Sequence, residues 1–583
     1  IRDIAVLIID SDARPAGSFG ATLSARGTRG DRQAGCAAGN LSAPRRCRWG
    51  GPHITGWSES DNAGHPARRG IAMKTNAVIA TSGGEWWALA APRSASKRPN
   101  HSTLLCATLA RMMRTLDTDY LVIGAGAMGM AFTDALIDHA DVHVTMVDRR
   151  HGPGGHWLDA YPFVRLHQAS TFYGVASTVI GGGAIQQYGP EEGLHERAGR
   201  AQIQAYYEAI MERRFLGSGR VNFLSGSDHH LEGTAHVVTS RVSGERLQVD
   251  VRRRVVDAAY LAPVIPALTP PPFAVGEGVR VATINELTTL ESAPSSYVIV
   301  GSGKTATDAI VWLLGNGLDP DRIVWVRPRD AWMLNRAVIQ PDPAVYTGVT
   351  ADTFEAAAES QTIEEVFLRL EDAGVMIRVD RAVAPTMARA PTLGGWELEL
   401  LRSVEHVVRL GHIRAANKGH LVLDGGVVPI PEDALVVHCA GKGLTNPPMV
   451  PIWGPELIRL QSIRAGFPCF GGALAGYVEA TRDDDRERNR LCPPNIFGDT
   501  LADWAQMQYR GSKAVATFGA EPDIAAWANA CHLNPSAIPP AQRDQPAVQA
   551  ARARIAGSYE RGLLRLAIYA RESSRQDPGS PSG

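Results

Sequence analysis

Two glycine-rich turns, each placed directly after a short apolar run, restrict the fold of this chain more than any other feature. The first lies in Tyr120–Gly129 (YLVIGAGAMG) and the second in Tyr297–Ala306 (YVIVGSGKTA). In such a turn the first glycine permits a tight bend, the second lets a pyrophosphate approach the backbone, and the third small residue allows close helix packing. We therefore expect an α/β protein with two dinucleotide-binding sites.

The first turn has the flanking elements that a dinucleotide site requires. The apolar run before Gly124 predicts a buried parallel strand, and a helix expected from Met128 to about Ala140 would direct its N-terminal N–H groups at the phosphates. A second strand, expected over 143–147, ends at Asp148, where a carboxylate binds ribose hydroxyls. The expected cofactor contacts in this part are Gly124, Gly126, Ala127, Met128, Gly129, Asp148 and Arg149.

The segment after Asp148 narrows the identity of the cofactor. Gly154-Gly155-His156-Trp157 is followed by Tyr161–Arg165 (YPFVR). This order resembles the FAD-binding segment of flavin-containing and Baeyer–Villiger-type monooxygenases, although a surface turn with a packing Trp is the alternative. The resemblance covers about residues 117 to 500. It implies bound FAD, with contacts from Gly155, His156, Trp157, Arg165 and Gln168. An acid that those families often carry after the Arg is replaced here by His167 and Gln168.

The second turn favours a phosphorylated nicotinamide cofactor. A strand expected over 322–326 ends at Arg327, a cation suited to the 2′-phosphate of NADP, with Arg329 as a possible helper; solvated surface arginines are the alternative. Lys304-Thr305 does not complete a P-loop, because the first glycine of that motif would fall on Val298. The expected NADP contacts are Gly301, Ser302, Gly303, Lys304, Thr305, Ala306 and Arg327.

Two further apolar strands suggest how the two nucleotide domains are connected. Arg254–Tyr260 and Ala434–Gly441 each end in small residues. The resemblance implies that they mark the exit from and the return to the FAD domain, with Ala440 and Gly441 at the cofactor, so that the NADP domain is inserted in the FAD domain. The expected divisions are an N-terminal extension (1–112), the first part of the FAD domain (113–284), the NAD(P) domain (285–425), the FAD-domain return (426–500), a helical C-terminal region (501–572) and a disordered tail (573–583).

The first 112 residues differ from the rest in composition, being rich in Gly, Ala, Ser, Arg and Pro without a persistent amphipathic period. We expect translated upstream sequence rather than part of the fold, since Met113 lies where flavoproteins of this kind usually begin. A long targeting peptide is the competing interpretation.

Composition excludes several other classes of function. The net charge of −1 gives no indication of nucleic-acid or membrane-surface binding, and no apolar stretch is long enough for a membrane span. The seven cysteines include no CxxC pair, which argues against a zinc site and against a disulfide reductase and favours a reducing, cytoplasmic compartment.

These motifs together predict an FAD-dependent oxidoreductase that passes hydride from NADPH to flavin, monooxygenase-like, with an unknown small organic substrate. The FxGxxxHxxx(W/Y) fingerprint of the resembled families has only a partial counterpart, Phe273–Arg280, which lacks the His. The alternative is therefore a flavin- and nucleotide-binding protein without oxygenation, such as an NADPH dehydrogenase, oxidase or sensor. The catalytic candidates are His156, Arg165, His167 and Gln168, for each of which a purely cofactor-shaping role is the alternative.

Overall fold

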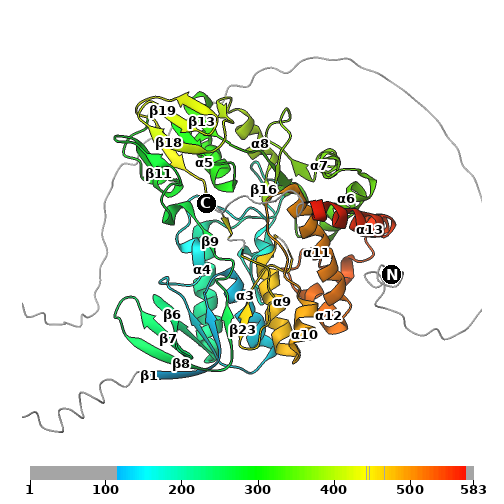
Figure 1. Ribbon diagram of the computed structural model, residues 1–583. Helices are drawn as coiled ribbons and strands as arrows, with labels where there is room; N and C mark the ends of the chain where they lie inside the picture. Colours follow the sequence, from blue (N-terminus) through cyan, green and yellow to red (C-terminus); the bar gives the residue numbers. More distant parts are fainter. Residues whose placement is uncertain (1–113, 442, 445–446, 465, 573–583) are drawn as a thin grey trace, which may run out of the picture. The chain divides into compact units, whose positions relative to one another are not determined.

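The computed structural model describes residues 114–572 except 442, 445, 446 and 465 (Figure 1). The expected N-terminal extension (1–112) and tail (573–583) lie outside the described residues. Within the described part, the chain forms two large sheets with parallel cores, smaller mixed and antiparallel sheets, and a helical C-terminal region. The α/β fold class predicted from the two turns is confirmed. No helix in this part is both long enough and apolar enough to cross a membrane.

The first sheet has seven strands, and its parallel core carries the first glycine turn. β1 (Arg114–Ile123) lies between β2 (Val144–Val147) and β8 (Arg246–Asp257), and it pairs in parallel with both. The outer strands are β5 (Val221–Leu224), β6 (Ser227–Glu232), β7 (Ala235–Ser240) and β23 (Leu457–Arg459). The strands predicted before and after the first helix are confirmed, and the strand predicted within 254–260 forms the end of a longer strand, β8.

Two helices far apart in sequence pack against each other beside this sheet. α3 (Ala127–His139) follows the first turn, and α9 (Pro468–Thr481) comes after β23. A Cβ atom added to Gly472 would lie 2.8 Å from the carbonyl oxygen of Met128, and one on Gly476 would collide with the carbonyl of Phe132. Glycine is therefore what allows α9 to lie directly against α3.

The second sheet has five strands, all parallel, and carries the second glycine turn. Its order is β11–β21–β12–β13–β17, and α5 (Lys304–Gly315) covers one face. The strands are β11 (Arg280–Thr283), β12 (Tyr297–Val300), β13 (Ile323–Val326), β17 (Val407–Val408) and β21 (Leu435–His438). On the other face, Val298 and Val300 pack against a sheet of β10 (Ala274–Val275), β18 (Ile413–Asn417), β19 (His420–Leu423) and β20 (Gly426–Pro429).

Two expected domain boundaries need correction. The second sheet already begins with β11, which was expected to lie in the first part of the FAD domain (113–284). The strand within Ala434–Gly441 was expected to return the chain to the first sheet, but β21 pairs with β11 and β12 of the second sheet. A short apolar strand buried on both faces suits any parallel sheet, so its composition does not reveal which sheet it joins. The chain rejoins the first sheet only at β23, which pairs with β8.

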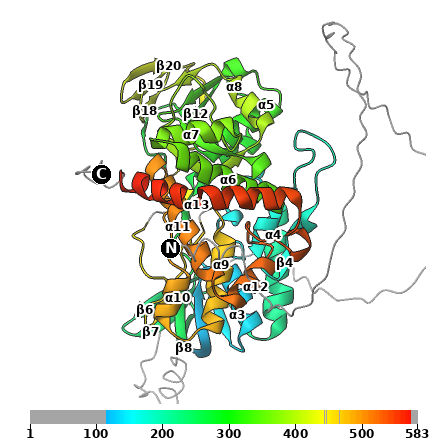
Figure 2. The same ribbon diagram turned by 90° about the vertical axis from the view of Figure 1, so that its right-hand side faces the viewer.

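The C-terminal helices pack on an excursion of the chain that leaves the second sheet after β13. The excursion contains α6 (Pro343–Glu359) and α7 (Ile363–Asp372), and Figure 2 shows α13 (Pro546–Glu572) running along α6. The rings of Phe354 and Tyr559 lie 4.8 Å apart at this contact. The predicted helical C-terminal region is confirmed. The remaining helices and strands are β3 (Gly174–Val175), β4 (Thr178–Val179), α4 (Arg200–Ala209), β9 (Pro263–Val264), β14 (Ala331–Asn335), β15 (Met376–Ile377), β16 (Met387–Leu393), α8 (Gly395–Arg402), β22 (Gly443–Leu444), α10 (Asp485–Leu491), α11 (Leu501–Gly519) and α12 (Pro522–Ala530).

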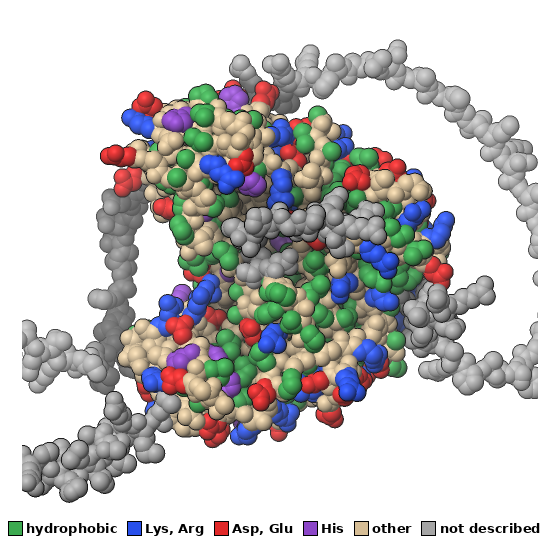
Figure 3. Space-filling model, viewed as in Figure 1, with side chains coloured by type: hydrophobic (Ala, Val, Ile, Leu, Met, Phe, Trp, Pro, Cys, Tyr) green, Lys and Arg blue, Asp and Glu red, His purple; other side chains and the backbone are tan. Residues whose placement is uncertain are grey.

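Charged side chains of both signs are interspersed on the face shown in Figure 3, in keeping with a net charge of −1. Such mixing keeps a surface hydrated without creating a strong field of one sign.

Candidate nucleotide-binding sites

The first glycine turn joins β1 to α3 in the geometry that a pyrophosphate site requires. Gly124 has φ 106°, a conformation that favours glycine, and its N–H donates to the carbonyl of Val147 at 2.8 Å. A Cβ on Gly129 would collide with the carbonyl oxygen of Gly124. Gly126 is the N-cap of α3, and the first turn of α3, which begins with Ala127 and Met128, carries no acidic side chain. The positive end of the helix therefore faces the turn without a competing carboxylate.

Asp148 follows β2 and lies against the same turn. Its Oδ2 accepts a hydrogen bond from the Ala125 N–H and its Oδ1 one from the Arg150 N–H, both at 2.8 Å. The carboxylate is buried and held by the backbone, and each oxygen retains a lone pair for a ribose hydroxyl. Of the two arginines that follow, Arg150 pairs with Asp159, whereas the Arg149 side chain is exposed.

The glycine pair after Asp148 packs against the first turn. Gly154 and Gly155 have φ of 108° and 61°, and the Gly154 N–H donates to the carbonyl of Ala125 at 2.8 Å. A Cβ on Gly155 would lie 2.9 Å from the Cα of Gly126, so the two backbones meet without side chains between them. The structure thus brings the predicted segment to the predicted turn.

His156 and Trp157 directly follow the glycine pair, and their rings pack beside each other. The indole N–H of Trp157 donates to the hydroxyl of Tyr173 at 2.6 Å, and the His156 ring lies 5.3 Å from the indole. Burial, with a smaller contribution from the charge of Arg150, lowers the pKa of His156 to about 4. The imidazole is therefore neutral at physiological pH.

The segment from Tyr161 to Gln168 reaches from the first domain to the second turn. The Tyr161 hydroxyl donates to Asp308 of α5 at 2.6 Å, and the Phe163 ring stacks on Trp312 of α5 with centroids 4.7 Å apart. Asp308 also pairs with Lys304 of the second turn. The predicted Tyr-Pro-x-x-Arg run is therefore a contact between the two nucleotide domains.

His167 lies where the two candidate sites meet. Burial, together with the charges of Lys304, Arg336 and Arg197, lowers the pKa of its imidazole to about 3. Its Nδ1 is buried and has no hydrogen-bond partner among the residues that the structure describes. Gln168 is buried beside it, whereas the Arg165 side chain is exposed and donates to the carbonyl of Arg197 at 3.4 Å. Of the candidates in this segment, His167 and Gln168 are therefore the inward ones.

The second glycine turn has the same plan with more room. Gly301 has φ 138°, and its carbonyl accepts from the indole N–H of Trp325 at 2.8 Å. A Cβ on Gly303 would meet no atom of the described residues within 4 Å. Gly303 caps α5, whose first turn has no acidic side chain. The other predicted contacts divide by burial: Ser302, Lys304 and Thr305 are partly exposed, and Ala306 is buried.

The small residues after β21 also lie at this second turn. A Cβ on Gly301 would come within 3.1 Å of the Cys439 carbonyl and 3.5 Å of the Ala440 nitrogen. Ala440 was expected at the first cofactor together with Gly441, which stands close to Pro266 instead. The reason is the membership of β21 in the second sheet.

Arg327 follows β13 as predicted, but it is buried. Only 3% of its surface is exposed, its guanidinium pairs with Asp330 at 2.6 Å, and it stacks over the Trp325 ring at 4.5 Å. Burial lowers the pKa of Arg327 to about 10, so it stays charged at neutral pH. Arg329, the possible helper, is exposed and lies 3.4 Å from Asp499.

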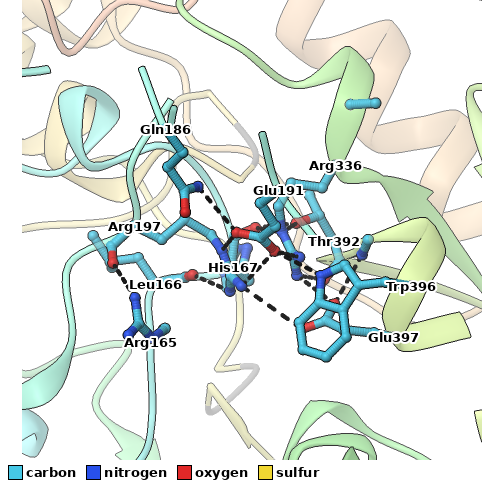
Figure 4. A network of polar contacts seen from close by, with 12 residues as sticks. Arg165, Leu166, His167, Gln186, Glu191, Arg197, Arg336, Thr392, Trp396 and Glu397 are labelled. Atoms are coloured by element: carbon cyan, nitrogen blue, oxygen red, sulfur yellow. Dashed lines mark hydrogen bonds and ion pairs between the residues drawn. The ribbon is translucent and has the colours of Figure 1, made fainter. Parts of the chain in front are cut away.

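A buried network of charges lies beside His167, and the motifs did not indicate it (Figure 4). Arg336, which is 1% exposed, pairs with Glu191 and, at 2.7 Å, with Glu397; its Nε donates to the carbonyl of His167 at 3.1 Å. Arg197 binds Glu191 through two nitrogens, at 2.6 and 2.9 Å. Burial raises the pKa of Glu191, but the hydrogen bond and charge of Arg197, with the charge of Arg336, outweigh it and hold the pKa at about 2.

This network ties the two domains together, because Glu191 and Arg197 come from the first domain and Arg336 and Glu397 from the excursion and α8. Its members are separated by up to about 200 positions in sequence, so no local motif marks them. The one available signal was Arg336, a single charge within the mostly apolar run Trp332–Ile339 (WMLNRAVI).

One family model and several solved structures are similar to parts of this chain. A family model described as an NAD(P)-binding Rossmann-like domain matches residues 122–168, which contain the first turn and Asp148. Among solved structures, the chain is similar to a polycyclic ketone monooxygenase from Thermothelomyces thermophila: 15% identity, TM-score 0.44, covering 81% of this chain and 91% of that one. It is also similar to an oxidized steroid monooxygenase bound to NADP: 13% identity, TM-score 0.38, covering 63% and 85%.

A closer relative in sequence comes from Mycobacterium tuberculosis strain H37Rv. The uncharacterized protein Rv2000 is 39% identical over 424 residues, which cover 72% of this chain and 78% of the relative. Protein Mb2023 of Mycobacterium bovis has the same identity and coverage. The chain therefore belongs to the same family as these mycobacterial proteins.

Proposed function

We propose that the protein is an FAD-dependent oxidoreductase that consumes NADPH and acts, in the manner of a monooxygenase, on a small organic substrate. The observation that carries the proposal is the meeting of the two glycine turns through one segment. Tyr161 of the first domain contacts α5 of the second, and His167 lies within the field of Lys304 of the second turn. Two nucleotide sites joined in this way favour transfer between two bound cofactors over two independent binding events.

The residues of the first site fit FAD. Asp148 presents a fixed carboxylate, Gly126 and Gly155 leave their backbones bare, and the helix end is free of acids. The second site fits a nicotinamide dinucleotide for matching reasons, since space is open at Gly303 and cations follow β13. When bound, a flavin accepts hydride from a reduced nicotinamide and delivers electrons to an acceptor.

The protein itself positions His167 and keeps its imidazole uncharged. Arg336 holds the His167 carbonyl, and burial keeps the His167 imidazole neutral at physiological pH. A neutral imidazole with an unpaired Nδ1 can exchange a proton or a hydrogen bond with a ligand at that place. His167 is thus the catalytic candidate that the geometry favours, ahead of the exposed Arg165.

A second function, NADPH oxidation without oxygenation, is favoured by the segment that only partly matches the monooxygenase fingerprint. Phe273 is buried in the core beneath the second sheet, and the Gly276 N–H donates to the carbonyl of Ala416 at 2.8 Å. This segment pairs with β18 and supplies no histidine. In that case, reduced enzyme would return its electrons to O₂ as hydrogen peroxide.

Anaerobic mixing of the purified full-length protein with NADPH tests the proposal. We expect a yellow protein whose flavin absorbance is lost on mixing. Admission of air with and without candidate ketones and amines, followed by product and peroxide assays, then separates the two functions. A colourless protein that cannot be reconstituted with FAD, or a flavin that NADPH does not bleach, would overturn both.

A further inference from the structure

A cleft of about 590 Å³ opens beside the carboxyl ends of β13 and β17. The register places two arginines side by side there: Val326 pairs with Val408, so Arg327 and Arg409 are the next residues on the two strands. The Arg327 N–H donates to the Val408 carbonyl at 2.9 Å, which fixes this neighbourhood through the backbone. The carboxyl ends of parallel strands are where such sheets bind ligands.

Cations outnumber acids around the cleft. Its charged residues are Arg327, Asp380, Arg381, Arg402, Glu405 and Arg409. Leu401 and Val404 add an apolar wall. A cleft with excess positive charge and an apolar side suits an anion attached to a flat, weakly polar ring system.

The two neighbouring arginines differ in what they can reach. Arg327 is buried between Trp325 and Asp330, whereas 32% of the Arg409 side chain is exposed. Arg409 contacts Asp330 through Nε at 3.0 Å and Asp380 through Nη2 at 2.7 Å. Asp380 is itself partly exposed, so Arg409 can exchange it for an incoming anion while Asp330 still orients the guanidinium.

We propose that this cleft binds the adenosine 2′-phosphate end of NADP(H), and that Arg409, rather than the buried Arg327, contacts the phosphate. The inference rests on the proposed function and names the residue that sets the preference for the phosphorylated cofactor. Arg327 holds Asp330, and Asp330 orients Arg409. Asp380 occupies Arg409 when no anion is present and weakens the binding of an anion by competition.

Titration calorimetry on the full-length protein with adenosine 2′,5′-bisphosphate and 5′-AMP tests this placement, because the two ligands differ only in the 2′-phosphate. We expect Arg409→Met to raise the Kd of the bisphosphate about tenfold or more, the loss of one charge-assisted hydrogen bond, and to change the Kd of 5′-AMP less than about twofold. Arg414→Met is the matched control. Arg414 lies on β18, outside the cleft, and pairs with Asp424 as Arg409 pairs with Asp380. It should change neither constant.

Asp380→Asn provides an independent arm that does not remove a cation. It should tighten the bisphosphate severalfold and leave 5′-AMP unchanged, and it remains informative if Arg409→Met does not fold. Equal weakening of both ligands by Arg409→Met, or no tightening by Asp380→Asn, would overturn the placement. If NADPH bleaches the flavin but neither variant alters bisphosphate binding, only this inference fails; if the wild type binds neither ligand and NADPH does not bleach it, the proposed function fails as well.

Discussion

The two glycine turns share one plan but differ in how tightly they are built. At the first turn, a side chain on Gly129 would collide with backbone, and the acid that follows is held by two backbone N–H groups. At the second, Gly303 faces open space, and the charges are held by other side chains, Arg327 with Asp330 and Arg409 with Asp380. A side chain that is held by backbone N–H groups, such as Asp148, keeps its position. A side chain that is held by another side chain, such as Arg409, can exchange that partner for a ligand. We infer that the first site retains its nucleotide and the second exchanges it.

The largest expected effect concerns the junction between the two sites. Arg336→Met would remove the buried cation that pairs with both Glu191 and Glu397. Breaking a buried ion pair costs about 3–5 kcal/mol. We expect the free energy of unfolding in urea to fall by about that much. The control is Arg414→Met, which should stay within about 0.5 kcal/mol of the wild type. A loss below about 1 kcal/mol would show that Arg197 alone satisfies the acids.

The next effect compares the two turns directly. Gly129→Ala forces a Cβ into the Gly124 carbonyl and should cost about 3 kcal/mol, with loss of flavin. Gly303→Ala should change stability by less than about 1 kcal/mol and keep the flavin, because its φ of −90° suits alanine and space is open. Thermal unfolding and the ratio of flavin to protein absorbance measure both. Similar losses of stability and flavin in the two variants would contradict the inference that the first turn is packed more tightly than the second.

A smaller effect separates the two ligands. Asp148→Asn keeps the shape of the side chain but removes the negative charge of the group that accepts hydrogen bonds from the ribose hydroxyls. The free energy of FAD binding should therefore weaken by about 1.5–3 kcal/mol. Binding of adenosine 2′,5′-bisphosphate at the second site should be unchanged. Titration of the apoprotein with FAD, followed by fluorescence, gives the first constant, and calorimetry gives the second. A parallel loss of both affinities would mean that Asp148 acts on the fold.

The smallest effect is a pH dependence of stability at the junction. Because the folded-state pKa of His167 is lowered to about 3 while the unfolded value is near 6.5, the unfolded chain binds more protons between these values. Stability should therefore fall by about 1 kcal/mol as the pH drops from about 6.5 to about 5.5. His167→Gln should flatten this slope, with the remainder carried by other buried histidines such as His156. An unchanged slope in the variant would exclude His167 as a source.

The sequence predicted the local units and missed the relations between them. Apolar runs, glycines and the acid at the end of β2 follow one another within a few tens of residues, so pattern alone located both turns. The sheet that β21 joins could not be predicted, because pairing is decided by neighbours distant in sequence. The burial of Arg327 depends on Trp325 and Asp330 together, and the network around Arg336 on four separate segments.

The packing of α3 against α9 has a consequence for the order in which the protein is made. Roughly 330 residues of chain separate the end of α3 from the start of α9, so at about 5–20 residues per second a ribosome needs on the order of 15–60 s to deliver the second helix. During that interval the second parallel sheet can form from contiguous chain, while the first lacks both β23 and the helix that covers α3. The sheet that begins first is therefore completed after the second sheet, and the apolar face of α3 stays uncovered for longer during synthesis.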